Sequence, residues 1–452
     1  MRSSLTGGGS KGPALQLAAL AVSVVVFLAP AALAQTPEPL PLTLDDAIAR
    51  GLDGSHRIEE VSARHDAAAA VADQRHAATL PQFDLLAGYM RTNHVDNFVV
   101  PYAPDKFLVV YPDVPNNYNA RVNAQFPLYT GGRLPALERA AGADRAASVN
   151  DIEALRSDLK VDIARAFWNL VATIDAVAVL DESLTQMAAH VRDTRNRLDA
   201  GLIPPNDVLT AEAQESRERM LRIQAAGGRD LAEAALVRLI GLPPGTSVRP
   251  ILPDAPAPSL DRFDDLVAAA RANRSDRKAL ADRVAAAGAR GEAAAAGKRP
   301  TIAVGGGFDY ARPNPRIFPR KPEWNTSWDA SMNVTWPIFD GGRTDAETAE
   351  AAANRRAAEA RLAEFDTLLT LELRQRLTEI ETSQAAVAAA DDTIRAATEA
   401  RRVVNERFAA GVATSTDVLD AQTDIVRAGL DRTQAIAALR TAQAGLDRAV
   451  GR

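Results

Sequence analysis

The sequence predicts an α+β membrane protein, in which four β-strands per chain contribute to an oligomeric β-barrel that long α-helices continue. Three observations predict this fold. The chain contains two related halves, each half carries a pair of strands that alternate apolar and polar residues, and each half carries a helical pattern of about 67 residues. A four-stranded sheet with a lipid-facing side has open edges that hydrocarbon does not tolerate, so several chains must close the barrel together.

The two halves are related by an internal repeat with an offset of 210 residues. This offset aligns "FPLYTGGRLPA" (126–136) with "WPIFDGGRTDA" (336–346), and "RLDAGLIPPNDVL" (197–209) with "RFAAGVATSTDVL" (407–419). Near the start of each half the offset is 219, because "DDAIARG" at Asp45 matches "DDLVAAA" at Asp264. The first half therefore has nine extra residues between Gly88 and Phe126.

The repeat divides the chain into a first repeat at 35–240 and a second at 262–452. Residues 1–34 precede them and predict a secretory signal peptide, with Arg2 and Lys11 before an apolar run and a small-residue cleavage site at its end. An uncleaved membrane anchor is the alternative. Residues 241–261 form a proline-rich linker, whose prolines exclude a continuous helix or a central strand.

The composition suits long helices that pack through small residues, since 47% of residues are hydrophobic but only 5% are aromatic. The absence of cysteine excludes disulfides and thiolate metal sites, and the five histidines lack metal-ligand spacing, so no metal or cofactor is expected. Loss of Arg2 and Lys11 with the signal peptide leaves 50 basic and 58 acidic residues. The resulting net charge of −8 disfavours nucleic acid as a partner.

Each half presents its elements in the same order: a helix, a β-hairpin, a long helix, a tip turn and a return helix. The hairpins are expected at about 80–128 and 300–338, and the tip turns at about 201–206 and 411–416. A soluble sheet with one wet face is the alternative for a single hairpin, but aromatic residues near the strand ends favour a membrane girdle. The expected bounds are 44–78, 83–90, 119–126, 134–200 and 207–240, and in the second half 263–296, 302–310, 328–336, 344–410 and 417–450.

The long helical patterns exclude an isolated helix. About 67 residues at 1.5 Å each span roughly 100 Å, and helical propensity alone does not stabilise such a length. These helices must pack along their length in a bundle or coiled coil. A non-pore periplasmic coiled-coil scaffold or adaptor is therefore the main alternative from another class, but it does not explain two amphipathic hairpins at matching positions. Nothing indicates nucleophilic catalysis, so an enzyme is not expected.

The paired motifs resemble those of the TolC-like outer membrane efflux protein family. The resemblance rests on "FPLYTGGR" and "WPIFDGGR" at the strand ends and on "AGLIPPNDVLTAEAQ" and "AGVATSTDVLDAQ" at the helix turns, and it covers Leu42 to Gly451. It implies a homotrimer with a 12-stranded β-barrel in the cell outer membrane and an α-helical barrel in the periplasm. It also implies the exit duct of a tripartite efflux pump for small molecules such as drugs, or the outer membrane component of a type I secretion system. A periplasmic adaptor (membrane fusion) protein and an inner-membrane transporter are the implied partners.

Two glycines mark the tips where each long helix ends and the chain reverses. Gly201 and Gly411 suit the left-handed conformation of a helix C-cap. The resemblance implies that these tips contact the adaptor through Gly201, Leu202, Gly411 and Val412.

Two carboxylates follow the second tip. We expect Thr416 or Ser415 to cap the return helix, and the helix dipole then explains one carboxylate in the first turn. Asp417 and Asp420 are three residues apart, so they share a helix face and repel each other. Three copies would place six carboxylates at one constriction, where rings of aspartate attract cations. A selectivity ring is thus one interpretation and a first-turn role is the other.

The resemblance places "DVLD" at the periplasmic aperture. The repeat makes Asp207 the first-half counterpart of Asp417. The resemblance implies that Phe408 lies near the constriction, although packing explains a lone aromatic residue equally well. Some family members carry a basic residue that latches the closed aperture, and here that position is Ala413. A closed state must therefore rely on other contacts.

The paired GGR motifs do not predict a phosphate loop, because they lack the Lys-Ser/Thr ending and both follow a strand. We expect the glycines to permit the sharp change from strand to helix, and the arginines to lie near the membrane surface. The residues are Gly131, Gly132, Arg133, Gly341, Gly342 and Arg343.

Overall fold

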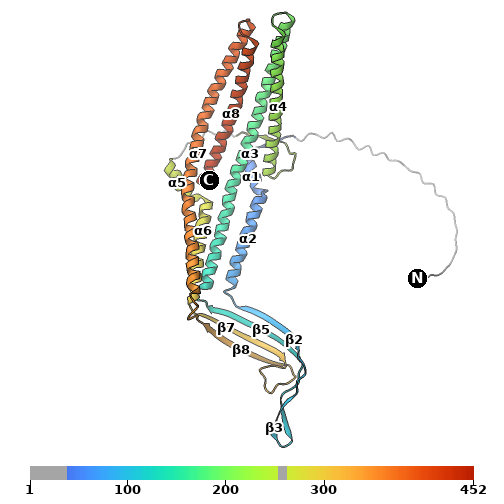
Figure 1. Cartoon of the computed structure of the whole chain (residues 1–452), viewed down its shortest axis with the longest axis vertical. Helices are drawn as coiled ribbons and strands as arrows, with labels where there is room; N and C mark the ends of the chain where they lie inside the picture. The colour runs from blue at the N-terminus through green and yellow to red at the C-terminus, as the bar shows by residue number, and fades with distance from the viewer. Residues whose placement is uncertain (1–37, 253–261) are drawn as a thin grey trace, which may run out of the picture. The chain divides into compact units, whose positions relative to one another are not determined.

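The fold is described from a computed structural model, in which residues 38–252 and 262–452 are placed (Figure 1). The predicted signal peptide and residues 253–261 of the predicted linker lie outside the described residues. Four strands form one antiparallel sheet in the order β2-β5-β7-β8, as the alternating residues predict. The strands are β2 (Gln82–Arg91), β5 (Asn116–Tyr129), β7 (Thr301–Arg312) and β8 (Asn325–Thr335).

The two hairpins have the same register. In the first, Phe83 lies opposite Ala124, and in the second Ile302 lies opposite Val334. Adding 219 to each β2 residue and 210 to each β5 residue converts every β2–β5 pair into a β7–β8 pair. The sequence offsets therefore hold at the level of backbone hydrogen bonding. The nine extra residues consequently fall between Arg91 and Asn116, a narrower interval than the sequence alone defined.

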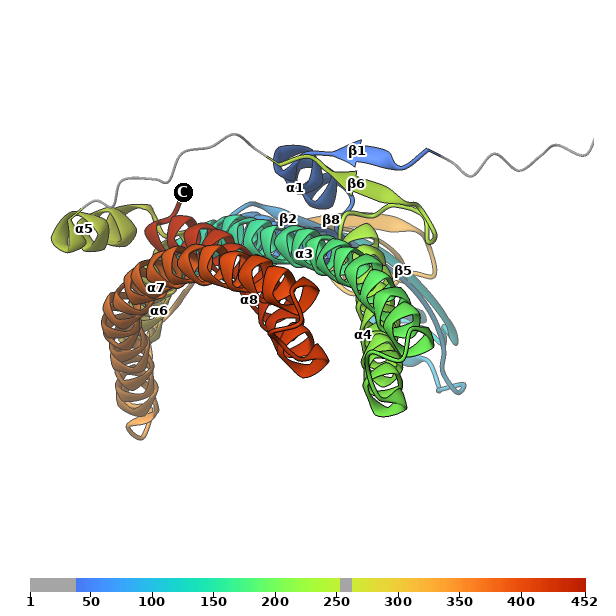
Figure 2. The same ribbon diagram turned by 90° about the horizontal axis from the view of Figure 1, so that it is seen from above.

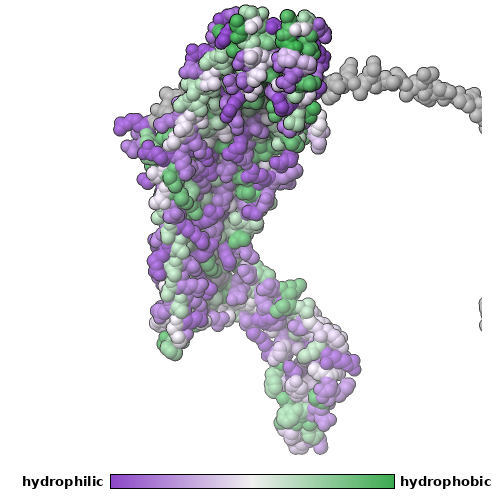
Figure 3. Space-filling model, turned by 45° about the horizontal axis from the view of Figure 1, so that its top comes forward, coloured by the Kyte–Doolittle hydropathy of each residue, from purple (hydrophilic) through white to green (hydrophobic). Residues whose placement is uncertain are grey.

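One face of the sheet is apolar and exposed. Tyr89 is 57% exposed, Trp328 73% and Met332 67%, although each is a large side chain that normally avoids water. Apolar residues also gather over the sheet end in the space-filling view (Figure 3). A contiguous apolar surface of this kind marks contact with lipid or another protein.

The loop between β2 and β5 contains a second hairpin that the sequence analysis missed. β3 (Phe98–Ala103) pairs with β4 (Lys106–Tyr111) as a separate two-stranded sheet. Its prolines, including Pro101 inside β3, led to the prediction of an irregular loop. Arg320 in the corresponding loop of the second half stacks 4.7 Å from the Tyr111 ring.

The prediction of a single helix at 44–78 is wrong, because the chain forms two helices there, α1 (Leu44–Asp53) and α2 (His56–Ala77). Gly54 is the C-cap of α1. The helix predicted at 263–296 is wrong in the same way. It is divided into α5 (Phe263–Asn273) and α6 (Ser275–Ala295), and a 3-10 turn (Ala296–Lys298) follows. No glycine or proline marks the second break, where Arg274 has a non-helical backbone (ψ 118°) and a buried side chain.

The long helices agree with the prediction to within two residues. They are α3 (Arg133–Asp199) and α7 (Arg343–Ala409), and the return helices are α4 (Pro205–Leu239) and α8 (Ser415–Val450). Near the sheet the helices lie side by side in the order α2-α3-α6-α7, and towards the tips in the order α4-α3-α8-α7. Viewed along their axes, these helices form a curved layer (Figure 2).

Two apolar cores stabilise the middle of this layer. The first packs Ile163 and Phe167 of α3 against Leu236 of α4, and α1 covers it. The second packs Leu369 and Leu373 of α7 against α5 and the end of α8. A short parallel pair that was not predicted, β1 (Leu40–Leu42) with β6 (Val248–Pro250), lies beside the first core.

Candidate functional site

Both tips are left-handed glycine turns, as predicted. Gly201 has φ +69° and Gly411 has φ +75°, and the amides of the next residues close the turns onto Arg197 and Arg407 at 2.8 and 2.9 Å. Leu202 is 73% exposed and Val412 is 64% exposed. The tips thus present one apolar side chain each to solvent, which suits contact with a partner.

The prediction that Thr416 or Ser415 caps α8 is wrong, because Thr414 is the N-cap. The glycine turn needs only four residues, so Thr414 is already extended and Ser415 begins the helix. Asp417 completes a capping box: it accepts from the Thr414 amide at 2.7 Å and from its hydroxyl at 2.8 Å. The Thr414 amide, followed by the hydroxyl, lowers the pKa of Asp417. The capping of the first turn thus explains why Asp417 is a carboxylate, but it does not explain Asp420.

Asp420 belongs to a longer acidic row. It lines a groove between α7 and α8 with Asp417, three residues before it, and the row continues with Asp424, four residues on, and Asp431, seven residues further, with Arg427 between them. Alanines of α7 form the opposite wall of this groove. Asp424 and Asp431 were not predicted, although their helical spacing from Asp420 indicates the same helix face. Asp207 has the matching position in α4 but no side-chain cap, since Pro204 precedes that helix.

Phe408 packs within the chain and is only 7% exposed, so packing is the interpretation that the geometry favours. The Arg197 guanidinium stacks 4.1 Å from the ring centroid and donates from Nη1 to the Phe408 carbonyl at 3.0 Å. The His190 ring lies 5.3 Å from the same ring, and its Nε2 is 2.9 Å from the Ser415 hydroxyl. A cation on α3 thus holds the second tip, where Ala413 offers none.

A buried polar network below the tips also escaped the sequence analysis. Glu218 is 2% exposed and accepts from the Ser183 hydroxyl at 2.5 Å, and the Gln422 amide donates to Ser183 at 2.9 Å. These residues join α4, α3 and α8. A buried carboxylate is tolerated only with such partners, so this network fixes how the three helices pack.

The GGR glycines lie between a strand and a long helix in left-handed backbone conformations. Gly131, Gly132, Gly341 and Gly342 all have positive φ, between +64° and +90°. Asp340 caps α7, since it accepts from the Gly342 and Thr344 amides at 3.0 Å, and mainly the Thr344 hydroxyl lowers its pKa to about 2. Arg133 and Arg343 are exposed.

The two turns differ in their surroundings. Arg299 donates from Nη1 to the Gly131 carbonyl at 2.9 Å, and a Cβ added at Gly131 would lie 2.8 Å from the Arg299 Cβ. A Cβ added at Gly341 would meet no atom of the described chain within 4 Å. The first turn is therefore covered, and the second is open.

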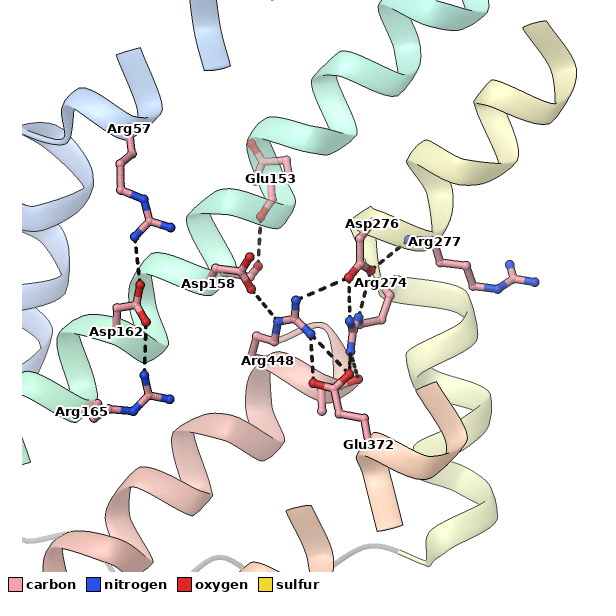
Figure 4. Close-up of polar contacts among 12 residues, drawn as sticks. Arg57, Glu153, Asp158, Asp162, Arg165, Arg274, Asp276, Arg277, Glu372 and Arg448 are labelled. Atoms are coloured by element: carbon pink, nitrogen blue, oxygen red, sulfur yellow. Dashed lines mark hydrogen bonds and ion pairs between the residues drawn. The ribbon is translucent and has the colours of Figure 1, made fainter. Parts of the chain in front are cut away.

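An ionic cluster joins both halves in the middle of the helical layer (Figure 4). Arg274, whose side chain is 5% exposed, bonds to Asp276 at 2.6 Å and to Glu372 at 2.7 Å. Arg448 bonds to the same Glu372 at 3.0 Å and to Asp158 of α3 at 2.7 Å. Burial opposes the charge of Arg274, but Asp276 and Glu372 outweigh it and raise the pKa of the guanidinium. Four helices are thereby joined at one point.

The polar face of the sheet carries another charged group. Arg121 of β5 bonds to Asp309 of β7 at 2.5 Å and to Asp329 of β8 at 2.8 Å, across the meeting point of the two halves. Among residues 38–252 and 262–452, no group of three His, Asp or Glu side chains is arranged to hold a metal ion.

The sheet has one exposed apolar face and two open edges, and the long helices that follow it extend about 100 Å. This combination is typical of a membrane channel protein. The outer membrane efflux protein family model matches residues 47–242 and 266–452. The chain belongs to that family and is an outer membrane channel that extends into the periplasm.

Individual relatives agree with this assignment. The chain is 29% identical to the outer membrane efflux protein BepC of Brucella suis over 328 residues, which cover 68% of each chain. It is 30% identical to Protein CyaE of Bordetella pertussis over 236 residues, and this match spans about half of each protein (50% and 48%). The fold matches the crystal structure of the outer membrane protein VceC of Vibrio cholerae with a TM-score of 0.77 at 20% identity, covering 90% of this chain and 96% of that one.

Proposed function

We propose that the chain forms a homotrimer and serves as the exit duct of a tripartite efflux pump for small molecules such as drugs. The single observation that carries the proposal is the four-stranded sheet, which has one exposed apolar face and two edge strands, β2 and β8, that pair with no further strand in the described part of the chain. Three copies supply twelve strands and leave no open edge in the bilayer. The long helices then continue the barrel as a tunnel, with Arg133 and Arg343 near the membrane surface.

The exposed tip residues fit a periplasmic adaptor protein. Leu202 and Val412 are apolar, exposed and supported by well-formed glycine turns at Gly201 and Gly411. An adaptor that binds there also connects the duct to an inner-membrane transporter. The duct itself is a passive conduit with no catalytic residues, so the transporter selects the cargo.

The acidic row is proposed to line the periplasmic entrance. Asp417 and Asp420 are exposed beside the second tip, and three copies bring six carboxylates to one opening. Such a ring attracts cations and resists anions. Asp207 lies at the matching point of the first tip, whereas Phe408 supports the entrance from within the packed tip.

Cell fractionation combined with an accumulation assay tests the duct. The wild-type chain should be recovered in the outer membrane fraction, require detergent, and lower the accumulation of a fluorescent efflux substrate in a strain that lacks it. Recovery as a soluble periplasmic protein would instead support the scaffold alternative. Crosslinking from Leu202 and Val412 identifies the partner, and capture of a protein-secretion transporter would favour type I secretion.

Ion selectivity tests the acidic entrance. Asp417→Ala combined with Asp420→Ala should move the reversal potential in a KCl gradient towards zero, because fewer fixed carboxylates then attract cations. Asp45→Ala with Asp53→Ala removes the same charge from exposed sites on α1, away from the tips, and is the matched control. An unchanged reversal potential in the first variant would reduce Asp417 and Asp420 to helix-start chemistry.

A further inference from the structure

The contact between the two halves inside one chain indicates how neighbouring copies contact each other. Within the chain the halves meet along one strand pair, β5 with β7, and next to the sheet along one helix pair, α3 with α6. Towards the tips they also meet along α3 and α8. The related elements on the outer flanks are β8 and β2 at the sheet edges, and α7 and α2 in the helical layer. These four elements have no such neighbour among the described residues.

We propose that β8 of one copy pairs with β2 of the next copy. The register follows from the β5–β7 pairs when 210 is added to the β5 residue and 219 is subtracted from the β7 residue. Val122 lies opposite Phe308 within the chain, so Met332 is placed opposite Tyr89 of the next copy. In the same way, Ala124 lies opposite Gly306 within the chain, so Val334 is placed opposite Ala87 of the next copy. The inference rests on the proposed oligomeric barrel and specifies its seam residue by residue.

The hairpins already show that the offsets transfer register. Every β2–β5 pair becomes a β7–β8 pair when 219 is added to the first residue and 210 to the second. The same operation is applied to β5 and β7 on the premise that neighbouring copies meet as the two halves do. A shift by one residue would turn the apolar face of β2 towards the lumen, so the register is strongly specified.

Alanine exposure in the helices supports the same seam. Ala147 of α3 is 2% exposed and Ala286 of α6 is 0% exposed. The residues at the related positions, Ala357 of α7 and Ala67 of α2, are also alanines, yet both are exposed. Identical residue types with opposite exposure indicate that α7 and α2 lack the neighbour that α3 and α6 have.

The open GGR turn completes this surface. Arg299 covers Gly131, and subtraction of 219 from Arg299 gives Leu80, which is 47% exposed. Leu80 of the next copy is therefore assigned to the space beside Gly341.

The seam between copies differs from the seam within the chain in its charges. Within the chain, Arg139 bonds to Glu292 at 2.6 Å, and Arg121 bonds to Asp309 at 2.5 Å. The transferred positions are Ala349 with Asp73, and Ser331 with Met90, which form no ion pairs. Backbone hydrogen bonds and apolar packing thus hold the copies together, and raised salt should not separate them.

Cysteine crosslinking tests the register in the full-length, membrane-assembled protein, because the native chain contains no cysteine. Tyr89→Cys with Met332→Cys should give crosslinks between copies, up to a covalently closed ring. Ala87→Cys with Met332→Cys is displaced by two residues on the same face, and its yield should be about tenfold lower, since diagonal Cβ atoms lie too far apart for a disulfide. Val122→Cys with Phe308→Cys calibrates the yield of the same geometry within one chain by peptide mass spectrometry.

Each outcome bears on one claim. Equal or better crosslinking of the displaced pair would overturn the register. The register would also be overturned if Tyr89→Cys with Met332→Cys gave no crosslink although the calibrating pair and both single-cysteine variants assemble normally. In those cases the channel function would stand, because assembly and conductance are measured on the same preparations. Failure of the cysteine-free protein to assemble would instead count against the proposed function.

Discussion

The two halves of the chain share backbone conformation at matching positions but differ in what covers them. The turn at Gly131 is covered by Arg299, whereas the turn at Gly341, with a φ only 5° larger, is open. The tip arginine of the first half lies over Phe408, whereas its counterpart Arg407 is exposed. Contacts between the halves thus cover the first-half turn, and in the proposed oligomer the second-half turn offers the same surface to a neighbouring copy.

The largest difference is expected at the ionic cluster (Figure 4). Arg274→Ala leaves Asp276 and Glu372 without their main partner and should lower the free energy of unfolding by about 3–5 kcal/mol. The first-half counterparts of Asp276 and Glu372 are Arg57 and Asp162, which form an ion pair of 2.9 Å that is about half exposed. Arg57→Ala is therefore the matched control, with a loss below about 1 kcal/mol. Urea unfolding of the detergent-solubilised protein measures both losses, and equal values would contradict the distinction.

The strand-to-helix turns should differ by a smaller amount. Gly131→Ala adds backbone strain of about 1–2 kcal/mol and forces a Cβ against Arg299, with a further cost of about 1–3 kcal/mol. Gly341→Ala should carry only the backbone strain, because a side chain of the next copy can move away from the open turn. The shift in thermal unfolding midpoint measures each effect. A larger shift for Gly341→Ala would mean that the open turn is packed more tightly than the covered one.

The tips should show a local difference. Arg197→Ala removes the stacking on Phe408 and one hydrogen bond, which together contribute about 1–2 kcal/mol to holding the second tip. Amide hydrogen exchange over residues 404–420 should accelerate about tenfold, and the channel should spend more time open. Arg407→Ala removes an arginine at the matching position as a control. Unchanged exchange in the Arg197 variant would show that other contacts hold the tip.

Acidification should slightly weaken the packing of His190 and Arg197 against Phe408 at the second tip. Burial lowers the pKa of His190 below 6.5, the nearby Arg197 lowers it further, and Asp193 opposes the shift. The unfolded tip therefore binds a proton first, so stability falls as the pH drops below 6.5 towards the folded pKa. Exchange of the tip amides should rise over that range in the wild type, after correction for the intrinsic pH dependence. In His190→Gln the corrected exchange should be flat, and a persistent rise there would assign the effect to another group.

The sequence was sufficient where the structure follows local periodicity. The alternation around Trp328 predicted β8, and the proline-free run from Thr344 predicted α7. It was insufficient where distant residues decide the local conformation. The break at Arg274 depends on partners in α7 and α8, and Phe408 is buried because Arg197 reaches it from 211 residues away.

Turn length explains the error at the cap. Four residues suffice to reverse the chain, so Thr414 rather than Thr416 or Ser415 reaches the N-cap position. The acidic row shows the opposite case, because Asp424 and Asp431 follow Asp420 at helical spacing and could have been predicted. The open turn at Gly341 could not be predicted from the sequence of one chain, since its proposed neighbour belongs to another copy.

Conductance in planar lipid bilayers tests the central claim most directly. Detergent-purified trimers of the wild-type chain should insert and give discrete, cation-preferring conductance steps. Trimers that are shown to be inserted, yet give no current above that of protein-free lipid, would contradict the account of this chain as an outer membrane duct.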